Sequence, residues 1–301
     1  MSRSFLYKKV KMGKYSKKEK YMFIEIIKFF IYSLLIVLIS KYILVKLLRK
    51  LAESLNLTAK AVGNIAGIAT SVPELLTVSF SAIAGLVGTS IYNIISSNVI
   101  NFLQYSFSIY ISKNQKSIRN KAIRIDLILV IVTILLPILM LIAKIEFSIS
   151  IVPIFILLFL LFYFINYNAH KLYLKKQEDK IKEKIENEKK WVKGKIKIII
   201  QYSFYLLFTS IALYIIGNAL SSCLENLANY FKIPEIILGI ALGFITSLPE
   251  LITFFEAQKH HEKKQKEELG VIEATNNLLT SNILNLFVIQ SIGIMIYSIF
   301  Y

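Results

Sequence analysis

Long apolar blocks separated by short charged segments constrain this chain more than any other feature. The chain is 55% hydrophobic and its mean hydropathy is +0.60. A helix of about 20 apolar residues crosses the hydrocarbon core of a bilayer, where only helices and closed barrels satisfy every backbone hydrogen bond. We therefore predict an all-α membrane protein with about eight transmembrane helices. The predicted spans are residues 21–48, 60–84, 90–112, 125–143, 147–168, 196–222, 235–257 and 270–300.

The charged segments predict how these spans are oriented. Residues 1–20 form a basic N-terminal tail, and residues 170–195 form a charged linker. If the linker is cytoplasmic, the links 49–59, 113–124 and 258–268 are cytoplasmic as well, and all three are basic. The positive-inside rule favours this orientation. It also places the basic tail on the opposite side, which the rule does not explain.

The net charge of +17 argues for membrane orientation rather than nucleic-acid binding. The charges occupy short links between apolar blocks, and no nucleic-acid-binding motif accompanies them. Cys223 is the single cysteine, so an intrachain disulfide and a cysteine-based metal site are both excluded. We expect an integral protein of the plasma (inner) membrane whose central linker is cytoplasmic and whose first partner is the lipid bilayer. The sequence leaves the oligomeric state open.

Two copies of one polar motif lie inside the apolar blocks. Thr-Ser-x-Pro-Glu occupies residues 70–74 and 246–250, and Ser-Asn-x-x-Asn follows at residues 97–101 and 281–285. The first elements align at a shift of 176 residues and the second at 184, because the charged link in the second copy is longer. Five spans separate each element from its copy, and an odd number inverts the copy in the membrane.

We therefore predict two inverted-topology repeats. The first comprises residues 21–169 with spans one to five. The second comprises residues 196–301 with spans six to eight, and we expect it to lack its last two helices. Inverted repeats place their binding site near the bilayer midplane, where broken helices meet.

The residue types in the motifs predict a cation site. A carboxylate in an apolar span is costly unless it has a cation or a wet cavity. Pro73 and Pro249 each remove one helix hydrogen bond and free a carbonyl oxygen. All candidate ligands are oxygens, which suit Ca²⁺ and lack the His and Cys that zinc or copper prefer. The candidate ligands are Glu74, Glu250, Thr70, Ser71, Thr246, Ser247, Ser97, Asn101, Ser281 and Asn285.

Each of these residues also has an ordinary structural explanation. Serine and threonine in membrane helices often bond their own backbone, and proline kinks are common. The duplication of both motifs at nearly equal spacing favours a binding site. The three histidines, His170, His260 and His261, lie in charged links, and we predict that they are solvated surface residues.

The motifs resemble the alpha repeats of the cation/calcium exchanger superfamily, in its sodium/calcium exchanger branch. The resemblance is specific over residues 51–105 and 227–290. In that family two inverted five-span halves build one cation pathway. The resemblance implies that Glu74 and Glu250 are the Ca²⁺ carboxylates, also touched by Na⁺, and that Asn101 lies at the site centre. It further implies that hydroxyls line the Na⁺ and Ca²⁺ positions and that backbone carbonyls complete them. Those hydroxyls belong to Thr70, Ser71, Thr246, Ser247, Ser97 and Ser281, and the carbonyls lie near Gly67 and Gly243.

Three features depart from the family pattern. Asn285 stands where the family often has an acid, which removes one charge from the site. Ser96 and Thr280 replace the glycine that usually precedes Ser-Asn, and we expect tighter helix contacts there. The second half has three predicted spans instead of five.

These observations predict an antiporter that exchanges Ca²⁺ for Na⁺ and uses no cofactor. An enzyme is not expected, because the sequence shows no set of nucleophile, base and acid. A Ca²⁺/H⁺ antiporter is one alternative, since burial favours the protonated form of a glutamate. A non-transporting cation-binding membrane protein is another, because the second half is short.

Overall fold

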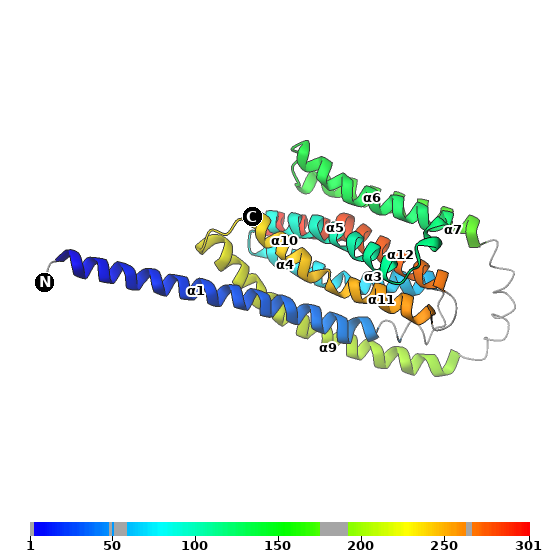
Figure 1. The fold of residues 1–301 in the computed structure, drawn as a ribbon, viewed down its shortest axis with the longest axis horizontal. Helices are drawn as coiled ribbons and strands as arrows, with labels where there is room; N and C mark the ends of the chain where they lie inside the picture. The colour runs from blue at the N-terminus through cyan, green and yellow to red at the C-terminus, as the bar shows by residue number, and fades with distance from the viewer. Residues whose placement is uncertain (1–2, 48–49, 51–58, 175–191, 263–266) are drawn as a thin grey trace.

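The computed structural model describes residues 3–47, 50, 59–174, 192–262 and 267–301, and no strand occurs among them. Figure 1 shows long helices gathered side by side into a bundle, as expected for an all-α membrane protein. The elements in chain order are α1 (Arg3–Ile39), η1 (Ser40–Val45), α3 (Ala59–Thr70), α4 (Val72–Ile83), α5 (Val87–Ile111), η2 (Gln115–Arg119), α6 (Lys121–Ile142), η3 (Ile149–Ile151), α7 (Val152–Leu174), α9 (Val192–Glu225), η5 (Asn226–Tyr230), α10 (Glu235–Thr246), α11 (Leu248–Glu262), α12 (Glu267–Ile283), η6 (Leu284–Ile289) and α13 (Gln290–Phe300).

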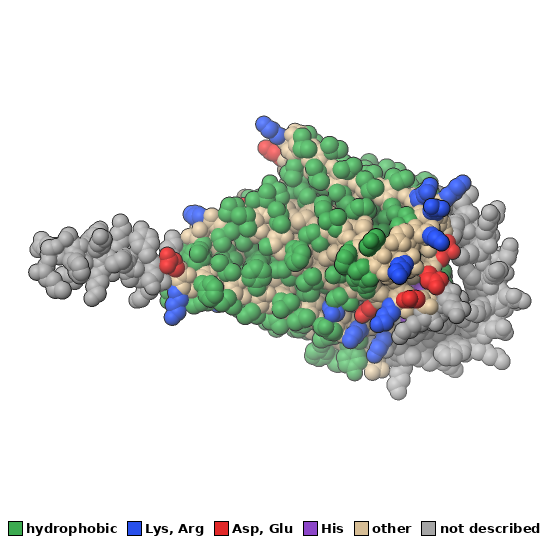
Figure 2. Space-filling model, viewed as in Figure 1, with side chains coloured by type: hydrophobic (Ala, Val, Ile, Leu, Met, Phe, Trp, Pro, Cys, Tyr) green, Lys and Arg blue, Asp and Glu red, His purple; other side chains and the backbone are tan. Residues whose placement is uncertain are grey.

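Among the described residues, seven helical segments are long and apolar enough to cross a membrane, and each overlaps a predicted span. Figure 2 shows hydrophobic side chains along the bundle and charged side chains near its ends. The segments are Glu19–Ile43, Ala59–Ile83, Ile123–Ile142, Ile149–Asn166, Ile211–Tyr230, Glu235–Glu262 and Glu267–Phe300. The remaining predicted span is α5, which has 25 residues. Its buried face carries Asn93, Ser97, Asn98 and Asn101, and these residues lower its hydropathy.

The helices extend beyond two of the predicted span boundaries. The sixth span is predicted to end at residue 222, but α9 and η5 continue the helix as far as Tyr230. Leu227 and Ala228 are buried there against the bundle, so the helix has an apolar face to pack. The basic tail at residues 1–20 is largely helical, because α1 begins at Arg3 and projects past the other helices in Figure 1.

The helices on either side of the predicted link at 258–268 extend into it. α11 continues to Glu262 and α12 begins at Glu267. Residues 263–266, and residues 175–191 of the predicted linker, lie outside the described residues. The same holds for residues 51–58 of the first basic link.

Each Thr-Ser-x-Pro-Glu motif interrupts its helix. Ser71 separates α3 from α4, and Ser247 separates α10 from α11. The cause is the following proline, Pro73 or Pro249, which lacks an N–H group and cannot bond the carbonyl four residues earlier. Each span is therefore a pair of short helices with a break inside the membrane.

The helices of the two motifs cross between the halves of the chain. α3 packs against α12, and α10 packs against α5. A Cβ on Gly67 would lie 2.7 Å from the carbonyl oxygen of Asn277, and one on Gly243 would lie 2.8 Å from that of Asn93. These partners are related by the same 184-residue shift as the motifs. Only glycine allows backbones to approach this closely.

The residues that replace the family glycine lie at these two crossings. Ser96 lies against Gly243 and Thr280 against Gly67. The Ser96 hydroxyl donates to the carbonyl oxygen of Tyr92 at 2.7 Å, which satisfies it within its own helix. At the other crossing, the Thr280 hydroxyl donates to Asn64 Oδ1 on α3 at 3.1 Å. Both crossings are therefore tight, and both hydroxyls have a partner.

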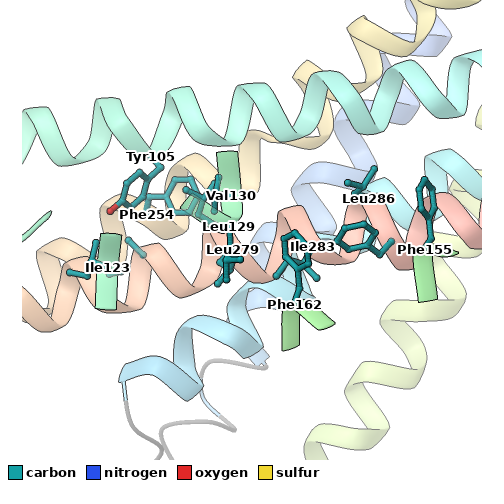
Figure 3. Packing of buried hydrophobic residues seen from close by; sticks show 14 of the residues in the cluster. Tyr105, Ile123, Leu129, Val130, Phe155, Phe162, Phe254, Leu279, Ile283 and Leu286 are labelled. Carbon is teal, nitrogen blue, oxygen red and sulfur yellow. The ribbon is translucent and has the colours of Figure 1, made fainter. Parts of the chain in front are cut away.

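α6 and α7 cover the outer face of α12 and η6. Figure 3 shows Phe155 of α7 near Leu286, Phe162 of α7 near Ile283, and Leu129 of α6 near Leu279. Phe287 is fully buried there, with its ring centroid 5.1 Å from that of Phe162. This apolar cluster fixes the helix that carries the second Ser-Asn-x-x-Asn motif.

α1 and α9 pack against each other on the other side of the bundle, beside α4 and α10. Lys28 and Glu25 form an ion pair at 2.8 Å. Cys223 is buried in its helix, and its thiol donates to the carbonyl oxygen of Glu25 at 3.1 Å. α1 and α9 therefore pack against both broken spans from one side.

The crossing of α10 and α5 gives a test of this packing. In Gly239→Val, the new Cβ would lie 2.7 Å from the carbonyl oxygen of Thr89 and 3.0 Å from the amide nitrogen of Asn93. Because backbone atoms cannot move aside, we expect the unfolding free energy to fall by about 1–3 kcal/mol. Thermal unfolding of purified protein in detergent measures the change. Ile240→Val, at a neighbouring residue that is 48% exposed, is the control. Equal Tm values for the two variants would contradict this packing.

Candidate cation site

Glu74 and Glu250 lie in the first turns of α4 and α11, directly after the two helix breaks. Both side chains are fully buried, and their carboxyls are close enough to interact electrostatically. The N–H groups in the first turn of a helix have no helical partner and favour negative charge nearby. The breaks thus place two acidic groups where the local backbone favours them.

Hydroxyl groups from both halves surround each carboxyl. The Ser97 and Thr246 hydroxyls lie near the Glu74 carboxyl, but neither makes a hydrogen bond to it. The Ser281 hydroxyl donates to Glu250 Oε1 at 3.1 Å. The Thr70 hydroxyl also lies near the Glu250 carboxyl, while it donates to the carbonyl oxygen of Gly67 at 3.3 Å. Each carboxyl is therefore flanked by one hydroxyl from its own half and one from the other half.

Further hydrogen bonds join the two halves at this point. The Ser71 hydroxyl donates to Ser281 Oγ at 3.0 Å and to the carbonyl oxygen of Gly67 at 2.8 Å. The Ser97 hydroxyl lies 3.4 Å from both Thr246 Oγ1 and the carbonyl oxygen of Gly243. The structure thus brings these predicted residues together with the two carboxyls.

Several buried oxygens of the predicted site have no hydrogen-bond partner among the described residues. They are Glu74 Oε1 and Oε2, Glu250 Oε2, Asn101 Oδ1, Asn285 Oδ1 and Ser247 Oγ. A buried acceptor without a partner costs roughly 1–3 kcal/mol, and more if it is charged. A bound cation would satisfy such oxygens together, so this donor set fits Ca²⁺ or Na⁺.

Ser247 differs from its repeat counterpart Ser71. The Ser71 hydroxyl has two partners, whereas the Ser247 hydroxyl has none among the described residues. A second asymmetry lies near Asn285, where the helix widens into the π-helical turn η6. α5 stays α-helical around Asn101. The second half-site therefore has a backbone that differs from that of the first. π-turns inside helices are frequent at functional sites.

Two asparagine–threonine pairs belong to this region, although the sequence did not single them out. Asn93 Nδ2 donates to Thr77 Oγ1 at 2.7 Å, and Asn277 Nδ2 donates to Thr253 Oγ1 at 2.6 Å. The oxygen of Asn93 accepts from Ser97 at 3.3 Å. The repeat alignment could have revealed both pairs, because the threonines differ by 176 residues and the asparagines by 184.

The prediction that His261 is a solvated surface residue is wrong. Its side chain is buried between α11 and α12, with Nε2 3.0 Å from Glu273 Oε2. Nearby, Gln258 donates to Ser108 and accepts from Asn114. These polar groups lie at the end of α11 away from the helix break, so they are not part of the cation site.

A protein-family model described as sodium/calcium exchanger protein matches residues 26–168 and 202–301. The matched residues include both broken spans and both Ser-Asn-x-x-Asn motifs. No curated protein and no solved structure matches the chain. Because the family model covers most of the chain, the protein belongs to the sodium/calcium exchanger protein family.

Proposed function

We propose that this member of the exchanger family is a secondary active antiporter that exchanges Ca²⁺ for Na⁺. The observation that carries the proposal is the group of buried oxygens without partners around Glu74 and Glu250. Two carboxylates and several neutral oxygens balance the charge of one Ca²⁺ and suit its coordination. The ligands would come from both halves of the chain, at the two helix breaks.

Competition for one set of oxygens would couple the two fluxes. Two carboxylates neutralise one Ca²⁺ or two Na⁺, and adding Na⁺ to a Ca²⁺-loaded site would bring like charges together. The site would therefore hold one load or the other. Alternating access then requires that a loaded site can open to either side of the membrane, as in other inverted-repeat transporters.

We further propose the orientation and location of the protein. Residues 21–169 and 196–301 would be inverted repeats in the plasma (inner) membrane, with the linker at 170–195 in the cytoplasm. The contacts at the two crossings support the repeat, because equivalent glycines meet equivalent asparagines. The basic links support the orientation.

Calcium uptake into proteoliposomes tests the exchange directly. Vesicles loaded with Na⁺ and diluted into Na⁺-free buffer should accumulate ⁴⁵Ca²⁺, because outward Na⁺ flow drives Ca²⁺ inward. Collapsing the Na⁺ gradient should stop the uptake. Uptake that ignores Na⁺ but follows a pH gradient would show a Ca²⁺/H⁺ antiporter instead. Calcium binding without flux would show a non-transporting cation-binding protein.

Glu74→Gln should reduce this uptake to the level of protein-free vesicles. The substitution keeps the size of the side chain but removes one of two charges that balance Ca²⁺. Asp126→Asn is the matched control, because Asp126 is also buried but its carboxylate bonds Asn166 on α7. Both variants should elute as monodisperse protein in size-exclusion chromatography. Near-normal uptake by Glu74→Gln would remove this residue from the site.

Sodium should compete with calcium for binding to purified protein. If two Na⁺ replace one Ca²⁺, a tenfold rise in saturating Na⁺ should raise the apparent Kd for Ca²⁺ about 100-fold by mass action. Isothermal titration calorimetry at several Na⁺ concentrations, with constant ionic strength, measures this dependence. Choline is the control cation. A Kd that responds equally to choline and Na⁺ would argue against a shared site.

A further inference from the structure

Asn98 and Asn282 bond each other's main chain where α5 meets α12. Asn98 Nδ2 donates to the carbonyl oxygen of Asn282 at 3.2 Å, and Asn282 Nδ2 donates to that of Asn98 at 3.2 Å. Both side chains are fully buried. The two bonds form a reciprocal clamp between the halves of the chain, and neither residue is among the predicted cation ligands.

The clamp fixes the orientation of the side-chain amides of Asn98 and Asn282. A main-chain carbonyl oxygen can only accept a hydrogen bond, so the amide nitrogen of each clamp residue must face it. The amide oxygen of each clamp residue therefore points elsewhere. Asn98 Oδ1 accepts from Asn285 Nδ2 at 3.1 Å, and Asn282 Oδ1 accepts from Asn101 Nδ2 at 3.3 Å.

These bonds also fix the amide orientation of two predicted ligands, Asn101 and Asn285. Because the clamp oxygens only accept, the amide nitrogens of Asn101 and Asn285 must face them. The Oδ1 atoms of Asn101 and Asn285 are then directed away from the clamp, and both are buried without a partner among the described residues. Asn101 also lies near the Glu250 carboxyl, since its Nδ2 is 3.4 Å from Ser281 Oγ, which donates to Glu250.

We infer that Asn98 and Asn282 are positioning residues that hold the amide oxygens of Asn285 and Asn101 toward the transported cation. The inference rests on the proposed function, because it assigns that cation site its two neutral amide ligands. Each half orients the ligand of the other half: Asn98 on α5 sets Asn285, and Asn282 on α12 sets Asn101. Without the clamp, an amide can turn its NH₂ group toward the cation, which repels it.

A double-mutant cycle on Ca²⁺ binding tests whether each clamp residue acts through the amide ligand that it orients. Asn98→Leu removes the acceptor for Asn285 and should weaken Ca²⁺ binding about 10- to 100-fold, as loss of a ligand-orienting partner typically does. In an Asn285→Ala background, which has no amide to orient, Asn98→Leu should weaken Ca²⁺ binding by less than about threefold. The Asn282→Leu and Asn101→Ala pair should behave in the same way. Calorimetric titration of purified protein with Ca²⁺ gives each Kd.

Ser90→Ala is the matched control on the same helix. Ser90 is fully buried and donates to the carbonyl oxygen of Val78, away from both clamp residues. Its Ca²⁺ affinity should stay within about twofold of the wild type, because its loss leaves both amides oriented. If Asn98→Leu does not fold, the cycle is repeated with Asn98→Ser, whose smaller polar side chain fits the same space.

The outcomes separate this inference from the proposed function. Wild-type protein that binds neither Ca²⁺ nor Na⁺ would overturn both. If the wild-type protein binds Ca²⁺ but Asn98→Leu weakens Ca²⁺ binding equally in the wild-type and Asn285→Ala backgrounds, only the positioning role of Asn98 is overturned. If Asn98→Leu strongly weakens Ca²⁺ binding in the wild-type background but not in the Asn285→Ala background, the positioning role is supported. A general packing defect would weaken binding in both backgrounds.

Discussion

The absence of water in the hydrocarbon core governs this structure. Every polar atom placed there must find a partner within the protein or in a ligand. Most buried asparagine, serine and threonine groups near the helix breaks do so by bonding across the two halves of the chain. The atoms left over near the two motifs are oxygens, and three of them belong to the carboxyl groups of Glu74 and Glu250. A buried region that leaves several carboxyl, amide and hydroxyl oxygens without partners is suited to a cation.

The glycine crossings make this arrangement geometrically possible. Without a Cβ at Gly67 and Gly243, the backbones of α3 and α10 lie directly against α12 and α5. That proximity brings short side chains such as Ser71 and Ser281 within hydrogen-bond distance. Larger residues at the crossings would separate the halves and leave the same hydroxyls unpaired. Helix packing and site chemistry are therefore set by the same few positions.

The sequence predicted the helical class, most spans and the two helix breaks, because apolar length and proline act locally. It ended the sixth span at residue 222, although the helix continues to Tyr230, since Leu227 and Ala228 gain burial only from neighbours distant in sequence. His261 was misjudged for a related reason: its partner Glu273 comes near only when α12 folds back along α11. The roles of Asn93 and Asn277 also depend on tertiary contacts, although their repeat spacing was visible.

The exchange of contacts between halves has a consequence for how the protein is made. Asn98 and Asn101 enter the membrane with α5, while their partners on α12 are synthesised about 180 residues later, a separation of the kind that slows folding. Until then, a strongly polar helix must remain in contact with lipid or with the insertion machinery. The contacts that complete the site can therefore form only after both halves of the chain have been made.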